Sequence, residues 1–227
     1  MKYHFITFAT KNYIDYAQNL CKSAIKIGKF DTARIFTYSD IDLEFLEKNK
    51  QILSLKRGAG YWLWKPYVIN KRLSNIGDDD VLCYCDSKYL FRSDIREIEK
   101  EYLLEKNLGI TQNKPDQGGS YKDKTFSKED AFNLMNITDN YKSLFKETPQ
   151  AWAGFILIRK TDFTVFFIKK WLDYCKNPLI ITDSKSITGP EDPNFIENRH
   201  DQTVLSLLAK KWGINFHTMK EKYLINA

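Results

Sequence analysis

The sequence predicts an α/β protein in which helices flank a mostly parallel central sheet. Over the first ~90 residues, short apolar stretches alternate with stretches of helical periodicity, as is typical of βαβ crossovers. The chain has 227 residues, which is enough for one well-packed domain and short for two. Because no repeat, low-complexity tract or long linker divides it, we expect a single domain over residues 1–227.

The first elements are a β-prone strand and an amphipathic helix. The strand is expected at residues 3–9, and the helix at 13–27, where apolar side chains recur every third or fourth position before Gly28. The pattern then predicts a strand at 33–38, a helix at 43–50 and a short strand at 51–55. Two glycines precede an aromatic-rich helix at 61–73, which has Pro66 near its first turn.

A turn at residues 77–80 leads into the most strand-like run of the chain, at 81–84. The second half is less regular, with strands expected at 108–111, 155–158 and 215–218 and helices at 163–174 and 201–212. Two polar loops, 113–121 and 183–198, are suited to close over ligands and exclude water.

Composition and charge limit the function classes. The net charge of +6 favours an anionic partner, but basic residues form no block of five or six, so no binding to nucleic acid is expected. The four cysteines include no C-x-x-C pair, which argues against a zinc finger or a disulfide framework and favours a reducing, cytoplasmic compartment. We expect no signal peptide and no membrane span, because no stretch approaches the ~18–20 apolar residues of a spanning helix.

The stretch V-L-C-Y-C-D-S-K, residues 81–88, places Asp86 at the end of a buried strand. In open parallel sheets, ligands bind outside the carboxyl ends of the strands, so Asp86 is a candidate site residue. A cap of the following turn is the simpler interpretation of Asp-Ser after a strand. The acidic run at 78–80 spells D-x-D, a metal-binding pattern, but it lies at the opposite end of the strand and is expected to be a solvated turn.

Immediately upstream, the segment K-R-G-A-G-Y-W-L-W-K-P combines cations with a flexible turn. Arg57 adjoins the Gly-x-Gly pair, and Lys65 lies on the same predicted helix as two tryptophans. Cations near a turn, with an acid one strand away, suit a diphosphate bound by protein charge and a divalent metal. Packing of the helix on the sheet is the alternative role of the tryptophans.

Three segments in order resemble the GT-A-fold glycosyltransferases, which use nucleotide-sugar donors. They are the lysine-bearing helix with its strand ending in Y-x-D, the Q-A-W-A-G-F-I-L-I stretch at 150–158, and R-H-D-Q-T-V-L at 199–205. The G-Y-W-L-W-K-P and H-D-Q elements most resemble small single-domain enzymes of large DNA viruses and of bacterial surface-polysaccharide loci. The location would be the host cytoplasm if the protein is viral.

The resemblance implies a Rossmann-like GT-A domain with a nucleotide-binding half at about 1–110 and an acceptor-side half at about 111–227. It implies transfer of a hexosyl or deoxyhexosyl group from a UDP- or GDP-sugar to a hydroxyl of a glycan or glycoprotein, such as a capsid or surface polysaccharide. On the donor side it implies base contacts from Thr7, Phe8, Ala9 and Thr10, stacking by Tyr13, and diphosphate contacts from Arg57, Lys65, Asp86, Ser87 and Lys88.

On the acceptor side, the resemblance implies that Trp152 stacks on a sugar, while Ala153 and Gly154 leave room for its ring. Asp201 would deprotonate the acceptor, with an N-cap of the helix as its alternative role, and His200 would be a base or an acceptor contact. The family holds Mn²⁺ with a Y-L-D-A-D motif, so Mn²⁺ or Mg²⁺ is expected at Asp86. Some members use a late histidine, which makes His217 a further candidate ligand.

The chain departs from this motif at its second acid, where Lys88 stands. Either Asp86 holds the metal with water and other help, or Lys88 itself neutralises the diphosphate. A metal-dependent nuclease is disfavoured, because Asp80 and Asp86 would lie ~20 Å apart on one extended strand and could not share an ion. A sugar-nucleotide-forming nucleotidyltransferase and a non-catalytic nucleotide-sugar-binding module remain as alternatives.

Overall fold

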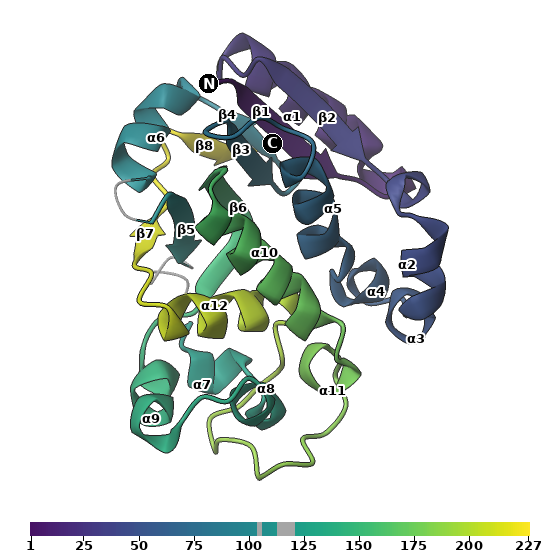
Figure 1. The fold of residues 1–227 in the computed structure, drawn as a ribbon, viewed down its shortest axis with the longest axis vertical. Coiled ribbons are helices and arrows are strands. Elements are labelled where there is room, and N and C mark those ends of the chain that lie inside the picture. The colour runs from purple at the N-terminus through teal and green to yellow at the C-terminus, as the bar shows by residue number, and fades with distance from the viewer. Residues whose placement is uncertain (104–105, 113–120) are drawn as a thin grey trace.

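The computed structural model describes residues 1–103, 106–112 and 121–227, and its centre is a six-stranded sheet (Figure 1). The strand order is β2-β1-β3-β6-β5-β7. The strands are β1 (Tyr3–Phe8), β2 (Thr32–Phe36), β3 (Val81–Cys85), β5 (Leu108–Gln112), β6 (Ala151–Arg159) and β7 (Phe216–Thr218). Only β6 runs against its neighbours among these six, so the prediction of a mostly parallel sheet is confirmed.

Helices cover both faces of this sheet. One face packs against α5 (Trp64–Leu73), α10 (Asp162–Cys175) and α12 (Asp201–Lys211). The other packs against α1 (Ile14–Lys26), α6 (Ile95–Tyr102) and a small antiparallel sheet of β4 (Tyr89–Phe91) and β8 (Leu224–Asn226). The small sheet and α6 were not predicted from the sequence.

The alternating side chains of strand β3 pack against different helices on the two faces of the sheet. Leu82 and Tyr84 belong to the core under α5 and α10, whereas Cys83 and Cys85 belong to the core under α1 and α6. Side chains of a strand alternate between its two faces, so Asp86 continues the row of Tyr84. The site is therefore built on the α5 face.

Shorter helices surround this frame. Beside the sheet lie η1 (Lys11–Tyr13), η2 (Tyr38–Asp40), α2 (Leu43–Lys48), α3 (Lys50–Leu53) and α4 (Gly58–Tyr61). Below it, in the view of Figure 1, lie α7 (Asp123–Phe126), α8 (Glu129–Leu134), α9 (Asp139–Glu147) and α11 (Pro178–Ile181). In the described part of the chain, no helix has the length and apolar character needed to cross a membrane.

Two local expectations were wrong. The short strand predicted at 51–55 is helix α3, in which the Leu53 amide donates to the Asn49 carbonyl at 3.0 Å and the adjacent Ile52 and Leu53 are both buried. The acidic turn is not fully solvated, because Asp80 is buried and accepts from the Lys2 amide at 2.6 Å and the Gly77 amide at 3.0 Å.

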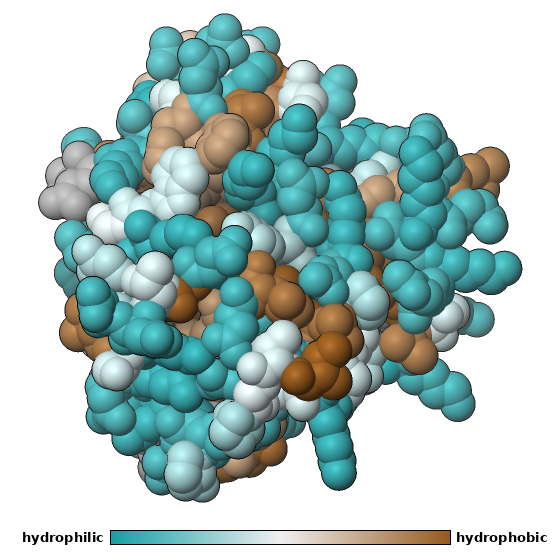
Figure 2. Space-filling view, turned by 60° about the horizontal axis from the view of Figure 1, so that its bottom comes forward, coloured by the Kyte–Doolittle hydropathy of each residue, from teal (hydrophilic) through white to brown (hydrophobic). Residues whose placement is uncertain are grey.

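The predicted loop at 183–198 is irregular but is attached to α8. Asp130 accepts hydrogen bonds from the amides of Ile187 and Thr188 at 3.0 and 2.9 Å, and Glu191 accepts from the Glu129 amide at 2.7 Å. The other predicted loop, 113–121, lies outside the described residues except for Tyr121. The face shown in Figure 2 is mostly hydrophilic, with apolar side chains in scattered patches.

Candidate functional site

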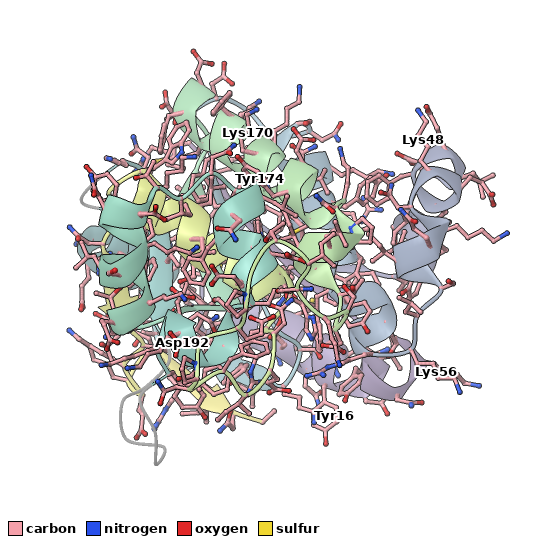
Figure 3. All side chains as sticks on the ribbon, turned by 90° about the horizontal axis from the view of Figure 1, so that it is seen from below. Tyr16, Lys48, Lys56, Lys170, Tyr174 and Asp192 are labelled. Atoms are coloured by element: carbon pink, nitrogen blue, oxygen red, sulfur yellow. The ribbon has the colours of Figure 1, made fainter. Side chains whose placement is uncertain are left out.

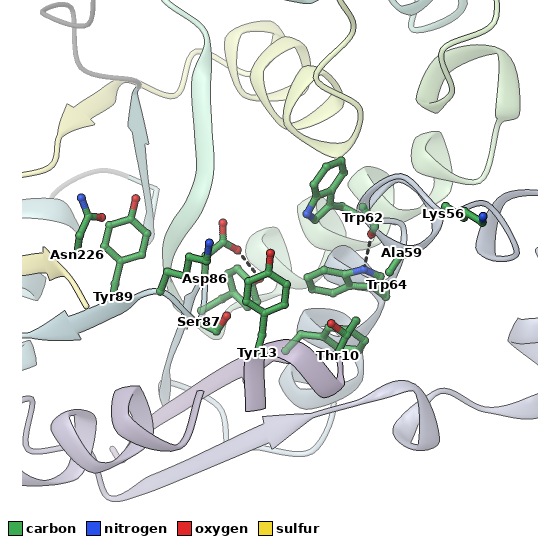
Figure 4. A pocket seen from close by; sticks show the side chains of 14 residues that line it. Thr10, Tyr13, Lys56, Ala59, Trp62, Trp64, Asp86, Ser87, Tyr89 and Asn226 are labelled. Atoms are coloured by element: carbon green, nitrogen blue, oxygen red, sulfur yellow. Dashed lines mark hydrogen bonds between the residues drawn. The ribbon is translucent and has the colours of Figure 1, made fainter. Parts of the chain in front are cut away.

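A cavity of about 580 Å³ opens at the carboxyl ends of β1 and β3, and we call it the Asp86 cavity (Figure 4). It contains one carboxylate, two lysines and several aromatic rings. Its lining residues are Phe8, Thr10, Tyr13, Lys56, Gly58, Ala59, Trp62, Trp64, Tyr84, Asp86, Ser87, Lys88, Tyr89 and Asn226. This is the edge of the sheet at which ligands of parallel α/β proteins bind.

Asp86 is fixed at the floor of this cavity by its neighbours. Its amide donates to the Gly154 carbonyl at 2.9 Å, which ties the end of β3 to β6. Its Oδ1 atom accepts from the Tyr84 hydroxyl at 2.6 Å and lies 3.2 Å from Lys65 Nζ. The Asp86 side chain remains 37% exposed, so it can still contact a ligand.

Lys65 lies behind Asp86 rather than in the cavity. Its ammonium is buried and contacts Asp86 Oδ1 at 3.2 Å, Asp201 Oδ2 at 3.4 Å and the Ala153 carbonyl at 3.1 Å. The contact with the Ala153 carbonyl is a hydrogen bond, and the two carboxylates are ion-pair partners of the ammonium. Burial alone would lower the pKa of Lys65, but Asp201 and Asp86 together raise it above its ordinary value. Lys65 therefore stays charged and orients Asp86.

Asp201 begins α12 and is as deeply buried as Lys65. The residue is 3% exposed, and its Oδ2 atom has no hydrogen-bond partner that meets normal geometry, only the nearby Lys65. Burial raises the pKa of its carboxyl to about 7; Lys65 opposes this shift and Asp86 adds to it. A carboxyl with this pKa has the strength of a general base, but it does not line the cavity.

The aromatic wall comes from β1 and α5. The rings of Phe8 and Trp64 stack with centroids 3.9 Å apart, and Trp64 Nε1 donates to the Gly58 carbonyl at 3.0 Å. Tyr13 lies between Asp86 and Trp64 in the view of Figure 4. Of the predicted base-binding residues, Phe8, Thr10 and Tyr13 line the cavity, while Thr7 and Ala9 are buried beneath it.

Residues 58–62 lie beside Trp64 and have an unusual backbone; Gly58, Ala59 and Trp62 among them line the cavity. All five have φ between 51° and 87°, the left-handed region, although only Gly58 and Gly60 are glycines. Each non-glycine residue there costs about 1–2 kcal/mol. The Tyr38 hydroxyl donates to the Ala59 carbonyl and the Gly60 amide donates to the Leu55 carbonyl at 2.8 Å, which holds the turn in place.

A second cavity, of about 560 Å³, has Arg57 in its wall, and we call it the Arg57 cavity. Arg57 is held there by Asp183 at 3.2 Å and Glu197 at 2.6 Å. Lys56 and Gly58, its chain neighbours, line the Asp86 cavity instead. The sequence had suggested that Arg57 lies close to Asp86, but the structure places Arg57 in the other cavity. The cation that this segment contributes to the Asp86 cavity is Lys56.

His200 is buried beside the Arg57 cavity. Its ring packs on Tyr61 and Trp62, and its Nδ1 atom lies 2.8 Å from the Ile181 carbonyl. Because a carbonyl only accepts, Nδ1 carries the hydrogen, and the buried Nε2 is an acceptor without a hydrogen-bond partner, 3.8 Å from Asp183 Oδ1. Burial lowers the pKa of His200 to about 4, so the ring is neutral at pH 7.

The predicted acceptor residues Trp152, Ala153 and Gly154 do not line the Asp86 cavity but contact residues that do, or that lie next to it. A Cβ at Gly154 would meet the Trp152 indole at 2.2 Å, so that space is filled by protein. Trp152 packs edge-on against Tyr89 at 5.3 Å, and Tyr89 lines the Asp86 cavity. The Ala153 amide donates to Gln202 at 3.1 Å, which ties β6 to the start of α12.

The protein groups at Asp86 do not fit a divalent cation. No group of three or more His, Cys, Asp or Glu side chains capable of holding one occurs in residues 1–103, 106–112 or 121–227, so phosphate and water would have to supply every ligand besides Asp86. The one carboxylate of the cavity already contacts an ammonium through Oδ1. His217 lies on β7, three strands from β3, with its ring stacked on Tyr102 at 4.7 Å.

Several residues of the Asp86 cavity were not predicted. Lys56 stands next to the predicted Arg57, whose extended backbone (φ −61°, ψ 127°) separates the two side chains into different cavities without a signal in the sequence. In Figure 3 and Figure 4, the Lys56 side chain reaches outward, at the end of the cavity opposite Asn226. Tyr89 and Asn226 come from the small sheet β4–β8, whose strands are too short to stand out in the sequence.

Comparisons with known proteins agree with this architecture. No protein-family model and no curated protein matches the chain. Among solved structures, the bifunctional glycosyltransferase WbbM is similar with a TM-score of 0.52 and 12% identity over 91% of this chain and 37% of its own. The chain thus spans little more than a third of WbbM.

Two further structures were found with lower scores. Mouse xyloside xylosyltransferase 1 has a TM-score of 0.48 and 12% identity over 97% of this chain and 86% of its own. The galactosyltransferase LgtC, in complex with donor and acceptor sugar analogues, has a TM-score of 0.46 and 14% identity over 89% of this chain and 69% of its own. The likeness to WbbM and the topology of the sheet identify the fold as GT-A.

Proposed function

We propose that the chain is a glycosyltransferase that moves a sugar from a nucleoside-diphosphate sugar, a UDP- or GDP-sugar, to a hydroxyl of a glycan or glycoprotein. One observation carries the proposal: Asp86, Lys88 and an aromatic wall meet in one cavity at the carboxyl ends of β1 and β3. Rings suit a nucleobase, lysines suit a diphosphate, and a carboxylate suits sugar hydroxyls. The GT-A fold supports the same conclusion by analogy.

In this proposal the first half of the chain, about 1–110, binds the donor. Phe8, Thr10 and Tyr13 surround the base, and Asp86 accepts hydrogen bonds from hydroxyls of the ribose or the sugar. Negative charge grows on the diphosphate as it departs, and the lysines of the cavity stabilise that charge. The divalent cation expected at Asp86 is no part of the proposal, because the protein groups there do not fit one.

The second half, about 111–227, serves the acceptor. Asp183 and Glu197 of this half, together with Arg57 from the first half, present acceptors and donors for sugar hydroxyls in the Arg57 cavity, with the Nε2 atom of His200 beside them. Asp201 has the pKa of a base but no access to either cavity, so we assign it as a positioning residue that acts through Lys65 and Asp86.

The test is release of nucleoside diphosphate from a panel of UDP- and GDP-sugars, with and without acceptor glycans. At least one donor should give release that an acceptor accelerates, and Asp86→Asn should reduce it ~100-fold or more. Asp78→Asn is the matched control, because Asp78 lies before the opposite end of β3 with a 91% exposed side chain. No release from any donor, or equal loss in both variants, would refute the proposal.

A further inference from the structure

Lys88 stands where the resembled glycosyltransferases place the second acid of their metal motif. It follows Asp86 by two residues, and both side chains line the Asp86 cavity. The Lys88 ammonium lies 5.1 Å from the ring centroid of Tyr13 and 5.9 Å from that of Tyr16. Two aromatic faces thus hold a cation beside the one carboxylate of the cavity.

The carboxylate of Asp86 is compensated without a metal ion. Lys65, buried 3.2 Å from Asp86 Oδ1, compensates the carboxylate from behind. Lys88 and Lys56 form no ion pair with a carboxylate of the described residues, so the cavity has two uncompensated positive charges. Two positive charges match the two negative charges on the diphosphate of a nucleotide sugar.

The same arrangement disfavours a divalent cation. An ion bound through Asp86 Oδ1 would lie close to the Lys65 ammonium, and Lys88 would add a second like charge from the cavity side. Like charges at such distances repel strongly, especially where one of them is buried. A diphosphate, in contrast, would be attracted by Lys88.

We propose that the Asp86 cavity binds a nucleoside diphosphate through Lys88, with Lys56 at its rim, and that Lys88 takes the place of a resident divalent cation. The inference rests on the proposed function and states how that site recognises its donor. Binding should therefore be independent of Mn²⁺ and Mg²⁺. It should weaken as salt rises, because contacts between charges at a solvent-exposed site are screened.

Calorimetric titration with UDP and with GDP, in EDTA and in Mn²⁺, tests this. The unmodified chain should bind at least one of them with an affinity that differs less than twofold between the two conditions. Lys88→Ala should weaken that binding about tenfold in both. Lys88→Asp, which restores an acid-x-acid pair, should bind at least tenfold more tightly in Mn²⁺ than in EDTA.

Lys26→Ala is the matched control, because Lys26 is exposed at the far end of α1, ~20 Å along the helix from Tyr13. Circular dichroism confirms that each variant is folded. Binding by the unmodified chain that is lost in EDTA and restored by Mn²⁺ would overturn the inference while leaving the proposed function intact. Equal affinity of Lys88→Ala and the unmodified chain would also overturn it. Binding of no nucleotide under any condition would overturn both.

Discussion

The Asp86 cavity and the Arg57 cavity are similar in volume, about 580 and 560 Å³, and share residues 56–58 as a wall. Their cations differ. The lysines of the Asp86 cavity, Lys56 and Lys88, have no carboxylate partner in the described part of the chain, and the cavity has one carboxylate. The Arg57 cavity is lined by three cations, Arg57, Lys128 and Lys185, and by three carboxylates, Asp183, Glu191 and Glu197, two of which hold Arg57. An anion entering the second cavity must compete with carboxylates already in place. Charge compensation, rather than the number of basic residues, therefore distinguishes a site for an anion from a site for a neutral, hydroxyl-rich ligand.

The largest expected effect concerns Lys65, whose ammonium is paired with the carboxylates of Asp86 and Asp201. Lys65→Met leaves two carboxylates facing each other, one of them buried, and should lower the free energy of unfolding by about 3 kcal/mol or more. Urea denaturation measures this. Asp201→Asn added to Lys65→Met should restore part of the loss, since it removes the buried charge. A double variant no more stable than Lys65→Met would show that the three groups do not act as one cluster.

The second effect is a pH dependence from Asp201, which is buried behind the first cavity in contact with Lys65. Its pKa is about 7 in the folded chain against an ordinary value near 3.8, so the folded state binds more protons between these pH values. Its contribution to stability is therefore complete below about pH 4 and is lost as pH rises through about 7. The difference in unfolding free energy between the unmodified chain and Asp201→Asn should fall over this interval. A constant difference would contradict the buried position of the carboxyl.

The sequence predicts elements whose pattern is local and fails for features that depend on contacts between distant residues. Strand β3 and helix α12 were predicted because their apolar pattern is local. Helix α3 was predicted as a strand because a four-residue element is too short for periodicity to separate the two.

The same holds for the residues of the candidate site. Asp86 was found from its place after a strand, whereas the burial of Lys65 depends on three elements that meet only in the fold. Tyr61 and Trp62 adopt φ of 51° and 58°, a conformation that residues of their type rarely prefer and that a local pattern does not predict.

Substitutions of the adjacent residues Lys56 and Arg57 should affect different cavities. Lys56→Ala should weaken binding of the nucleoside diphosphate a few-fold, because it removes one of two uncompensated cations. Arg57→Ala should leave that binding unchanged and reduce the rate at low acceptor concentration, because its charge is already paired. Titration and acceptor-dependent kinetics measure the two. If Arg57→Ala weakens diphosphate binding more than Lys56→Ala, the cavities have been assigned the wrong way round.

The smallest effect concerns the left-handed turn at residues 58–62 beside the Asp86 cavity. Ala59 has φ of 51°, where glycine is favoured, so Ala59→Gly should raise the unfolding free energy by up to about 1 kcal/mol. That corresponds to a rise in Tm of ~2–4 °C. Ala24→Gly, inside α1, is the control and should lower Tm instead. A lower Tm for Ala59→Gly would mean that the turn is not strained.

The central claim is that uncompensated positive charge beside Asp86 binds a diphosphate. A crystal structure of the chain with UDP or GDP tests it most directly. We predict that the diphosphate contacts Lys88 in the Asp86 cavity, while Arg57 keeps its pairs with Asp183 and Glu197. A diphosphate bound to Arg57, with the Asp86 cavity empty, would contradict the account.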